Sequence, residues 1–139
     1  DPQARHLVWD EVRHLKKNQV TIILTTHYMD EAEVLCDRIL IVDKGKIIEE
    51  GKPAELVKKH IGEDVLELDF DEKLLQTLKE AFPDARFEKL GERMQIFTNK
   101  PHGVFEGFLR DHPLQNVTIR KANIEDVFLK LTGRGLREE

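Results

Sequence analysis

The first part of the chain alternates between a helical pattern and a short apolar run. An apolar stripe at helical spacing comes first, made of Ala4, Leu7, Val8, Val12 and Leu15. The run Val20–Leu24 follows and is nearly all apolar, as is typical of a strand buried on both faces of a parallel sheet. Three polar residues, Thr25, Thr26 and His27, end it. Since open α/β sheets bind ligands at the carboxyl ends of their strands, these three residues are the first candidates for chemistry.

The next segment predicts a short helix and a hairpin. Acidic residues gather where the helix would begin, and its buried side would consist of Met29, Ala32, Leu35 and Cys36. Strands are expected at 38–42 and 46–50, joined by a tight turn in which Gly45 takes a positive φ. A helix beginning at Pro53 closes this part of the chain.

Beyond residue 60 the pattern becomes that of a separate α+β unit. Alternating or apolar segments predict strands at 64–70, 86–90, 94–98 and 117–121. Helical stripes fall after the first and the third of these strands, and Asn123 with Asp126 resembles a capping box for a last helix. The order strand–helix–strand–strand–helix–strand is the ferredoxin-like plan. We therefore predict two domains, at 1–60 and 61–139.

Composition narrows the possible functions. The 139 residues are 40% hydrophobic and 35% charged, with a formal charge of −5, as in a globular protein. Nucleic-acid binders usually carry a basic excess, so we expect no nucleic-acid partner. Cys36 is the only cysteine, which excludes an internal disulfide. No apolar run approaches the roughly 18 residues that span a bilayer, so any membrane role is expected through a partner.

Two sequence stretches resemble a known family. THYMDEAE, followed by LCDRILIVDKGKIIEEGKPAEL, resembles the C-terminal part of an ATP-binding cassette (ABC) transporter ATPase. DPQARHLVWDEVRHLKK resembles the end of that family's D-loop and the helix after it, so residues 1–60 are covered closely. THYMDEAE is similar to the branch that exports drugs, antibiotics or ions. NIEDVFLKLTG more weakly resembles the accessory domain that follows the ATPase in many exporters.

The resemblance implies a fold and two site residues. The fold class would be α/β, the C-terminal part of a P-loop NTPase-type sheet domain followed by a ferredoxin-like α+β domain. His27 would be the switch histidine that contacts the γ-phosphate of ATP. Asp1 would be the last residue of the D-loop, which communicates with the nucleotide site of the opposite subunit.

The resemblance also implies cofactors and partners. The full-length parent would use ATP and Mg²⁺ and would work with a second ATPase subunit and a transmembrane permease subunit. It would be cytoplasmic and peripheral, held at the inner face of the cell membrane through the permease.

The phosphate-binding motifs of the family are missing from this sequence. It contains no G-x-x-x-x-G-K-[ST] loop, whose backbone N–H groups and lysine would hold the phosphates. The LSGGQ-type signature and the Walker B strand are missing too. We therefore interpret the chain as a fragment that neither binds ATP tightly nor hydrolyses it, with no cofactor of its own. Because the missing strands would cover apolar faces, we expect the fragment to self-associate.

Several simpler interpretations stay open beside these. Asp1 would serve equally well as a helix N-cap, and a histidine at a strand end is often only a hydrogen-bonded structural residue. His27 and Glu31 lie four apart, but a transition-metal site needs a fuller ligand set, so we expect no metal. The competing function is a stand-alone regulatory or dimerisation module without ATPase activity. RNA binding would need aromatic side chains on an exposed sheet face, and Phe87 and Phe97 are more simply core residues.

Overall fold

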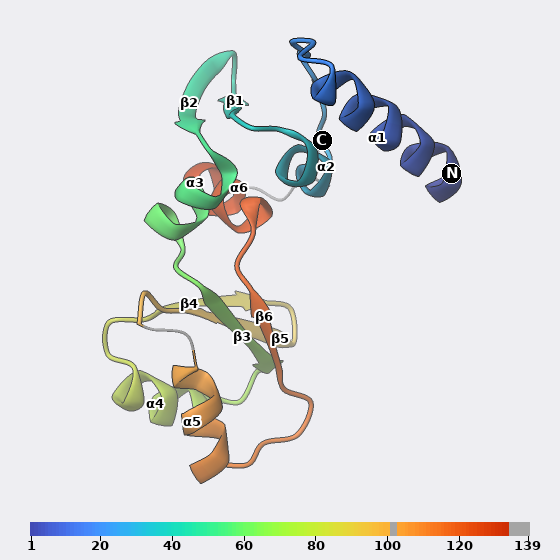
Figure 1. Ribbon diagram of the computed structural model, residues 1–139. Coiled ribbons are helices and arrows are strands. Elements are labelled where there is room, and N and C mark those ends of the chain that lie inside the picture. Colours follow the sequence, from blue (N-terminus) through green and yellow to red (C-terminus); the bar gives the residue numbers. More distant parts are fainter. Residues whose placement is uncertain (101–102, 134–139) are drawn as a thin grey trace.

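The computed structural model describes residues 1–100 and 103–133, arranged as two lobes (Figure 1). We call residues 64–100 and 103–121 the sheet lobe, and residues 1–61 and 122–133 the hairpin lobe. The helices are α1 (Pro2–Lys17), α2 (Met29–Leu35), α3 (Pro53–His60), α4 (Glu72–Ala81), α5 (Val104–Asp111) and α6 (Ile124–Thr132). The strands are β1 (Ile39–Asp43), β2 (Lys46–Gly51), β3 (Asp64–Asp69), β4 (Arg86–Leu90), β5 (Arg93–Phe97) and β6 (Thr118–Lys121).

The sheet lobe is a four-stranded antiparallel sheet with α4 and α5 on one face (Figure 1). Its strand order is β4-β5-β3-β6, so the first strand of the lobe lies in the centre of the sheet. Leu66, Leu68, Met94 and Ile96 point to the helix side and are almost fully buried. They are two apart along each strand, as the alternation of side chains in a pleated strand requires. Asp71 caps α4 by accepting hydrogen bonds from the backbone N–H groups of residues 73 and 74.

The hairpin lobe is built around α3, α6 and the β1–β2 hairpin. Lys44 (φ 50°) and Gly45 (φ 75°) form the tight turn of the hairpin, with the left-handed conformation that such two-residue turns need. One core unites side chains from the hairpin, α3 and α6, with α2 packed against it, and Val65 and Phe97 join from the sheet lobe. The last helix therefore packs against α2 and α3, although most of the chain after residue 60 lies in the other lobe. The division into domains at residue 60 stays a prediction.

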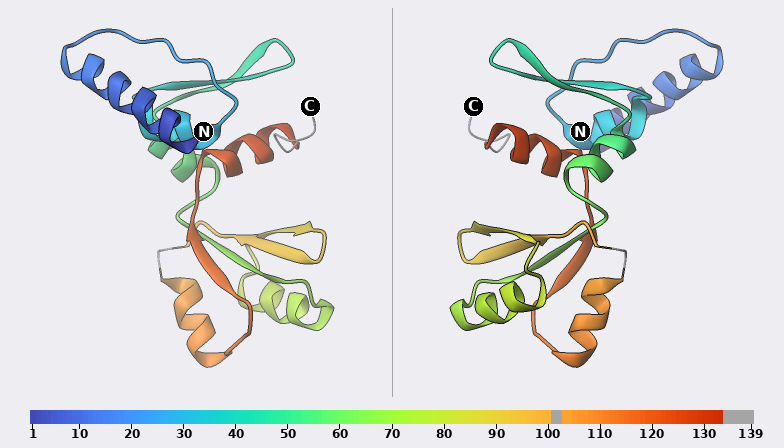
Figure 2. Two further views of the ribbon diagram at one scale, coloured as in Figure 1. Left: turned by 90° about the vertical axis from the view of Figure 1, so that its right-hand side faces the viewer. Right: turned by 90° about the vertical axis from the view of Figure 1, so that its left-hand side faces the viewer.

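Two chain segments cross side by side between the lobes (Figure 2). The outgoing one holds Gly62, whose φ is 117°. A Cβ atom at this position would collide with the carbonyl oxygen of Thr98, so only glycine fits. The returning segment is tied to the outgoing one by a hydrogen bond from the N–H of Ala122 to the carbonyl of Glu63, 2.8 Å long. Immediately after it, the predicted capping box of Asn123 and Asp126 is formed in full.

The expected buried strand at Val20–Leu24 was wrong. These residues form no strand in the described structure, and the side chains of Val20 and Ile23 are 46% and 94% exposed. The apolar stripe of α1 is also uncovered, with Leu7 71% exposed. A strand forms only with a hydrogen-bonded neighbour, and none of the described strands pairs with this segment. The observed architecture is thus an α/β chain whose described strands form two antiparallel sheets.

Candidate functional site

The beginnings of α1 and α2 meet around a hollow of about 570 Å³. Its lining includes both residues that the sequence singled out, His27 and Asp1. The full lining consists of Asp1, Pro2, Arg5, Thr25, Thr26, His27, Tyr28 and Glu31. The fold therefore brings together two predicted site residues that are far apart in the sequence.

His27 lies in the extended segment that leads into α2, and its side chain is exposed. Its imidazole packs on the ring of Tyr28, with ring centroids 4.3 Å apart and planes tilted by 35°. The backbone N–H of Tyr28 donates to Oγ1 of Thr26 at 3.0 Å, which fixes the backbone on both sides of His27. This geometry leaves the imidazole at the edge of the hollow, where it can donate a hydrogen bond to a ligand.

Asp1 is the N-cap of α1. Its carboxylate accepts a hydrogen bond from the backbone N–H of Gln3 at 3.0 Å, and its carbonyl accepts from the N–H of Arg5 at 3.0 Å. The capping interpretation of Asp1 is thereby confirmed. Its contact with the nucleotide site of a second subunit stays a prediction, as does the γ-phosphate contact of His27.

A cluster that the sequence reasoning missed closes one side of the hollow. Arg5 is its centre, paired with Asp30 on α2 at 3.0 Å. This pairing raises the pKa of Arg5, with its hydrogen bond to Asp30 as the largest cause. The guanidinium also lies over the rings of Trp9 and Tyr28, at 5.0 and 5.1 Å from their centroids. The spacing of Arg5 and Trp9, four apart on one helix face, was the available signal.

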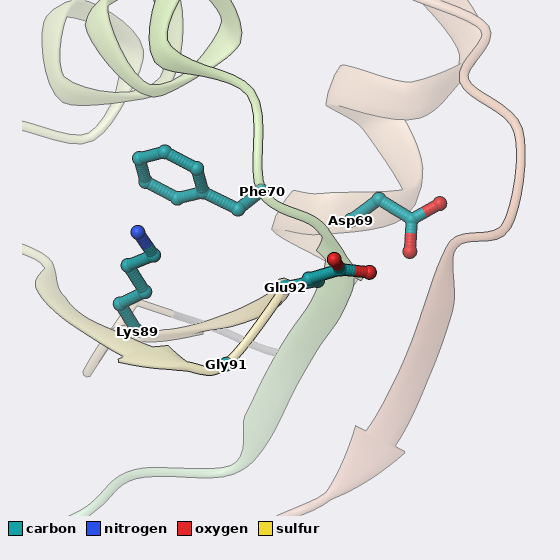
Figure 3. A pocket seen from close by; sticks show the side chains of 5 residues that line it. All are labelled: Asp69, Phe70, Lys89, Gly91 and Glu92. Carbon is teal, nitrogen blue, oxygen red and sulfur yellow. The ribbon is translucent and has the colours of Figure 1, made fainter.

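A second hollow lies at the end of the sheet lobe, near the turn between β4 and β5 (Figure 3). The ammonium of Lys89 points at the ring of Phe70, 4.1 Å from its centroid, which is a cation–π contact. The carboxylate of Asp69 pairs with Arg93 at 2.9 Å. Because these charged groups are occupied by neighbours within the lobe, we interpret this hollow as part of the surface and not as a binding site.

The described part of the chain lacks two kinds of feature. Among residues 1–100 and 103–133, none of the helices has the length and apolar character needed to cross a bilayer. Within the same residues, no three side chains among His, Cys, Asp and Glu are grouped closely enough to hold a metal ion.

Comparison with known proteins relates the chain to exporters. Residues 72–133 match the family described as the C-terminal domain of the nodulation factor export protein NodI. The chain is 41% identical to a Nod factor export ATP-binding protein I of Ralstonia nicotianae, over 99% of the chain and 44% of the relative. It is 41% identical to that of Cupriavidus metallidurans, over 99% of the chain and 45% of the relative. It is 42% identical to that of Mesorhizobium japonicum, over 99% of the chain and 40% of the relative.

The matches cover nearly all of this chain but only part of each relative. The chain spans less than half the length of these relatives. They are named for export and ATP binding, in agreement with the resemblance to ATP-binding subunits of exporters. Their names do not mention drugs, antibiotics or ions, so the narrower assignment to that branch is not supported by them.

Proposed function

We propose that this chain is the C-terminal part of the ATP-hydrolysing subunit of an ABC exporter. The observation that carries the proposal is the meeting of His27 and Asp1 at one hollow, between the beginnings of α1 and α2. Similarity to export ATP-binding proteins over 99% of the chain supports it independently. In the whole subunit, ATP with Mg²⁺ would supply the phosphoryl group whose transfer drives export.

The residues present fit the edge of a nucleotide site and not its phosphate cradle. His27 offers a ring N–H at the rim of the hollow, whereas Arg5 is already paired with Asp30. No glycine-rich phosphate loop occurs in the sequence. His27 would therefore act on a γ-phosphate held by other parts of the subunit, where a fixed hydrogen-bond donor stabilises developing charge and orients the attacking water. The chain by itself would bind no ATP.

The proposal extends to the two domains. Residues 1–60 would be the end of a P-loop NTPase-type sheet domain. The rest would be a ferredoxin-like accessory domain that mediates dimer contacts or regulation. The order β4-β5-β3-β6 supports the second assignment, because a strand–helix–strand–strand–helix–strand chain with its first and third strands central has that plan.

Partners and location follow from the same proposal. Each subunit would pair with a second ATPase subunit and with a transmembrane permease, and would lie on the inner face of the cell membrane. From THYMDEAE the cargo would be a drug-like molecule or an ion, while the names of the relatives point to a nodulation factor. Self-association of the isolated chain, through exposed side chains such as Ile23, also stays a prediction.

The test is a His27→Ala substitution in the full-length subunit. We expect kcat for ATP hydrolysis to fall about a hundredfold, the usual cost of removing one fixed donor to the transition state. His112→Ala is the matched control, because His112 is an exposed histidine at the C-cap of α5, stacked on Phe108 in the sheet lobe. Unchanged hydrolysis in the His27→Ala subunit would remove the basis of the proposal.

The alternative function, a stand-alone regulatory or dimerisation module, is distinguished from the first proposal by the sequence upstream of the Asp1 codon. The reading frame upstream of the Asp1 codon encodes a phosphate loop under the first proposal, and a start codon under the second. Calorimetric titration with ATP tests the prediction that the chain alone does not bind ATP tightly. A dissociation constant in the micromolar range would contradict it.

A further inference from the structure

The contacts around Arg5 join the first turns of two helices. Its Nη2 donates to both carboxylate oxygens of Asp30, at 3.1 and 3.0 Å, and its Nε lies 3.6 Å from a carboxylate oxygen of Glu31. The indole Nε1–H of Trp9 donates to the same oxygen of Glu31 at 3.0 Å. We call Arg5, Trp9, Tyr28, Asp30 and Glu31 the α1–α2 clamp.

The clamp has more contacts than an isolated surface ion pair. The side chain of Glu31 is only 16% exposed and receives both Trp9 and Arg5. The guanidinium of Arg5 also faces two aromatic rings, which adds cation–π attraction to the charge pairing. A planar guanidinium with several partners loses less freedom per contact than a lysine would, so this geometry depends on arginine.

The clamp touches both sides of the hollow. Arg5 lies one helical turn after Asp1, and its backbone N–H donates to the carbonyl of Asp1. Tyr28 directly follows His27 and packs against both the imidazole and the guanidinium. Displacement of Arg5 would therefore move the beginning of α1 and the segment that carries His27 relative to each other.

The core of the hairpin lobe does not include α1. Within the described residues, none of the side chains of α1 is buried, and the core is formed by α3, α6 and the hairpin, with α2 packed against it. Apart from the clamp, Lys16 ties the other end of α1 to the carbonyl of Leu35 and to Asp37, at 2.9 Å each. The clamp thus sets the position of α1 without being needed to form the core.

The geometry points to Arg5 as a positioning residue, which acts through the α1–α2 clamp to hold His27 and Asp1 in register at the nucleotide. This inference rests on the proposed function of His27. Arg5 lines the hollow, but its guanidinium faces Asp30 and Glu31. In this role it would fix the backbone from which the donor acts, and small misplacements of catalytic groups are costly.

The test is Arg5→Gln in the full-length subunit, alone and combined with His27→Ala. We expect kcat to fall about tenfold with KM for ATP changed less than about twofold, because no residue of the clamp belongs to a phosphate-binding loop. In the His27→Ala background the same substitution is expected to lower kcat less than about twofold, since its effect passes through His27. Trp9→Phe, which keeps the ring and loses the donor to Glu31, is expected to lower kcat about threefold.

The control is Arg38→Gln. Arg38 is an exposed arginine of the hairpin lobe outside the clamp, paired with Glu50 at 2.8 Å, and we expect no change in kcat. Thermal unfolding of each variant separates loss of function from loss of folding. Equal losses for Arg5→Gln in both backgrounds, or none in either, would overturn the positioning role. If His27→Ala itself had no effect, the proposed function and this inference would fail together, whereas a large His27→Ala effect beside a silent Arg5→Gln would sink the inference alone.

Discussion

The two lobes differ in how far their apolar side chains are exposed to solvent. In the sheet lobe Leu78, Ile96 and Phe105 are 0% exposed. In the hairpin lobe, Leu7 and Ile23 are 71% and 94% exposed. The sheet lobe therefore buries most of its apolar side chains among its own helices and strands, although Val65 and Phe97 join the core of the hairpin lobe. The hairpin lobe does so only around α3 and α6.

Most of the large apolar side chains exposed in the hairpin lobe lie in three places. Exposed apolar side chains occur on α1, on the segment 20–24 and on the outer side of the β1–β2 hairpin, where Leu40 and Val42 are more than half exposed. Apolar side chains that gather on a surface mark places where another polypeptide packs. The relatives are more than twice as long as this chain.

The largest expected effect comes from substituting one leucine in a helix of each lobe, which tests the difference in burial between the lobes. Leu78→Ala in α4 removes a fully buried side chain, and we expect it to lower the free energy of unfolding by about 3 kcal/mol. Leu7→Ala in α1 changes an exposed side chain, and we expect a change below about 0.5 kcal/mol. Urea unfolding followed by circular dichroism measures both. Similar losses for the two variants would contradict the difference between the lobes.

The second test concerns the polar contacts that join the lobes. Arg120 on β6 makes a two-pronged pair with Asp126 of α6, at 2.8 and 2.7 Å, and Asp126 is only 3% exposed. Arg120→Ala would leave this carboxylate buried without its cation, and we expect a loss of about 2 kcal/mol in unfolding free energy.

Arg38→Ala is the control for Arg120→Ala. Arg38 pairs with Glu50 at 2.8 Å, but both side chains are more than half exposed. We expect a change below about 0.5 kcal/mol in the same urea experiment, since exposed pairs contribute little. An Arg120→Ala loss no larger than this would show that the pair does not join the lobes.

The smallest expected effect is a pH dependence within the hairpin lobe. A hydrogen bond from His60, 2.6 Å long, is the largest cause that lowers the pKa of Glu49, which is about 2. Because a glutamate in the unfolded chain has a pKa of about 4.3, the contribution of this carboxylate to stability is full above that pH and is lost as pH falls toward 2.

Carbon-detected NMR titration of the Glu49 carboxyl group measures this pKa directly. We expect His60→Ala to return the pKa of Glu49 toward its ordinary value. Lys59→Ala should move it less, since the contact of Lys59 with Glu49 is longer, at 3.3 Å. A pKa of Glu49 that is insensitive to His60 would assign the shift to another cause.

Sequence reasoning worked where the determining contacts are local. The capping box at Asn123 and the turn at Gly45 each depend on a few neighbouring residues, and both are present in the structure. The strands of the sheet lobe were found for the same reason, since alternation is a property of each strand alone.

The remaining features depend on residues far apart in the chain. The segment 20–24 has the composition of a buried strand, but whether it pairs depends on strands elsewhere. The packing of α6 in the hairpin lobe could not be predicted from its apolar stripe. The stripe indicates that one face of the helix is buried, but it does not identify the element that covers this face. Likewise, the spacing of Arg5 and Trp9 placed them on one face, but only the fold brought Asp30 and Glu31 to them.

The crossing of two segments between the lobes has a mechanical consequence. A lobe connected by a single chain segment can rotate about the backbone bonds of that segment. Here the chain enters through Gly62 and leaves through Ala122, and the hydrogen bond from Ala122 to Glu63 ties the two paths together. A rotation of the sheet lobe therefore acts on α3 and α6 together, and the two lobes are expected to move as a coupled pair.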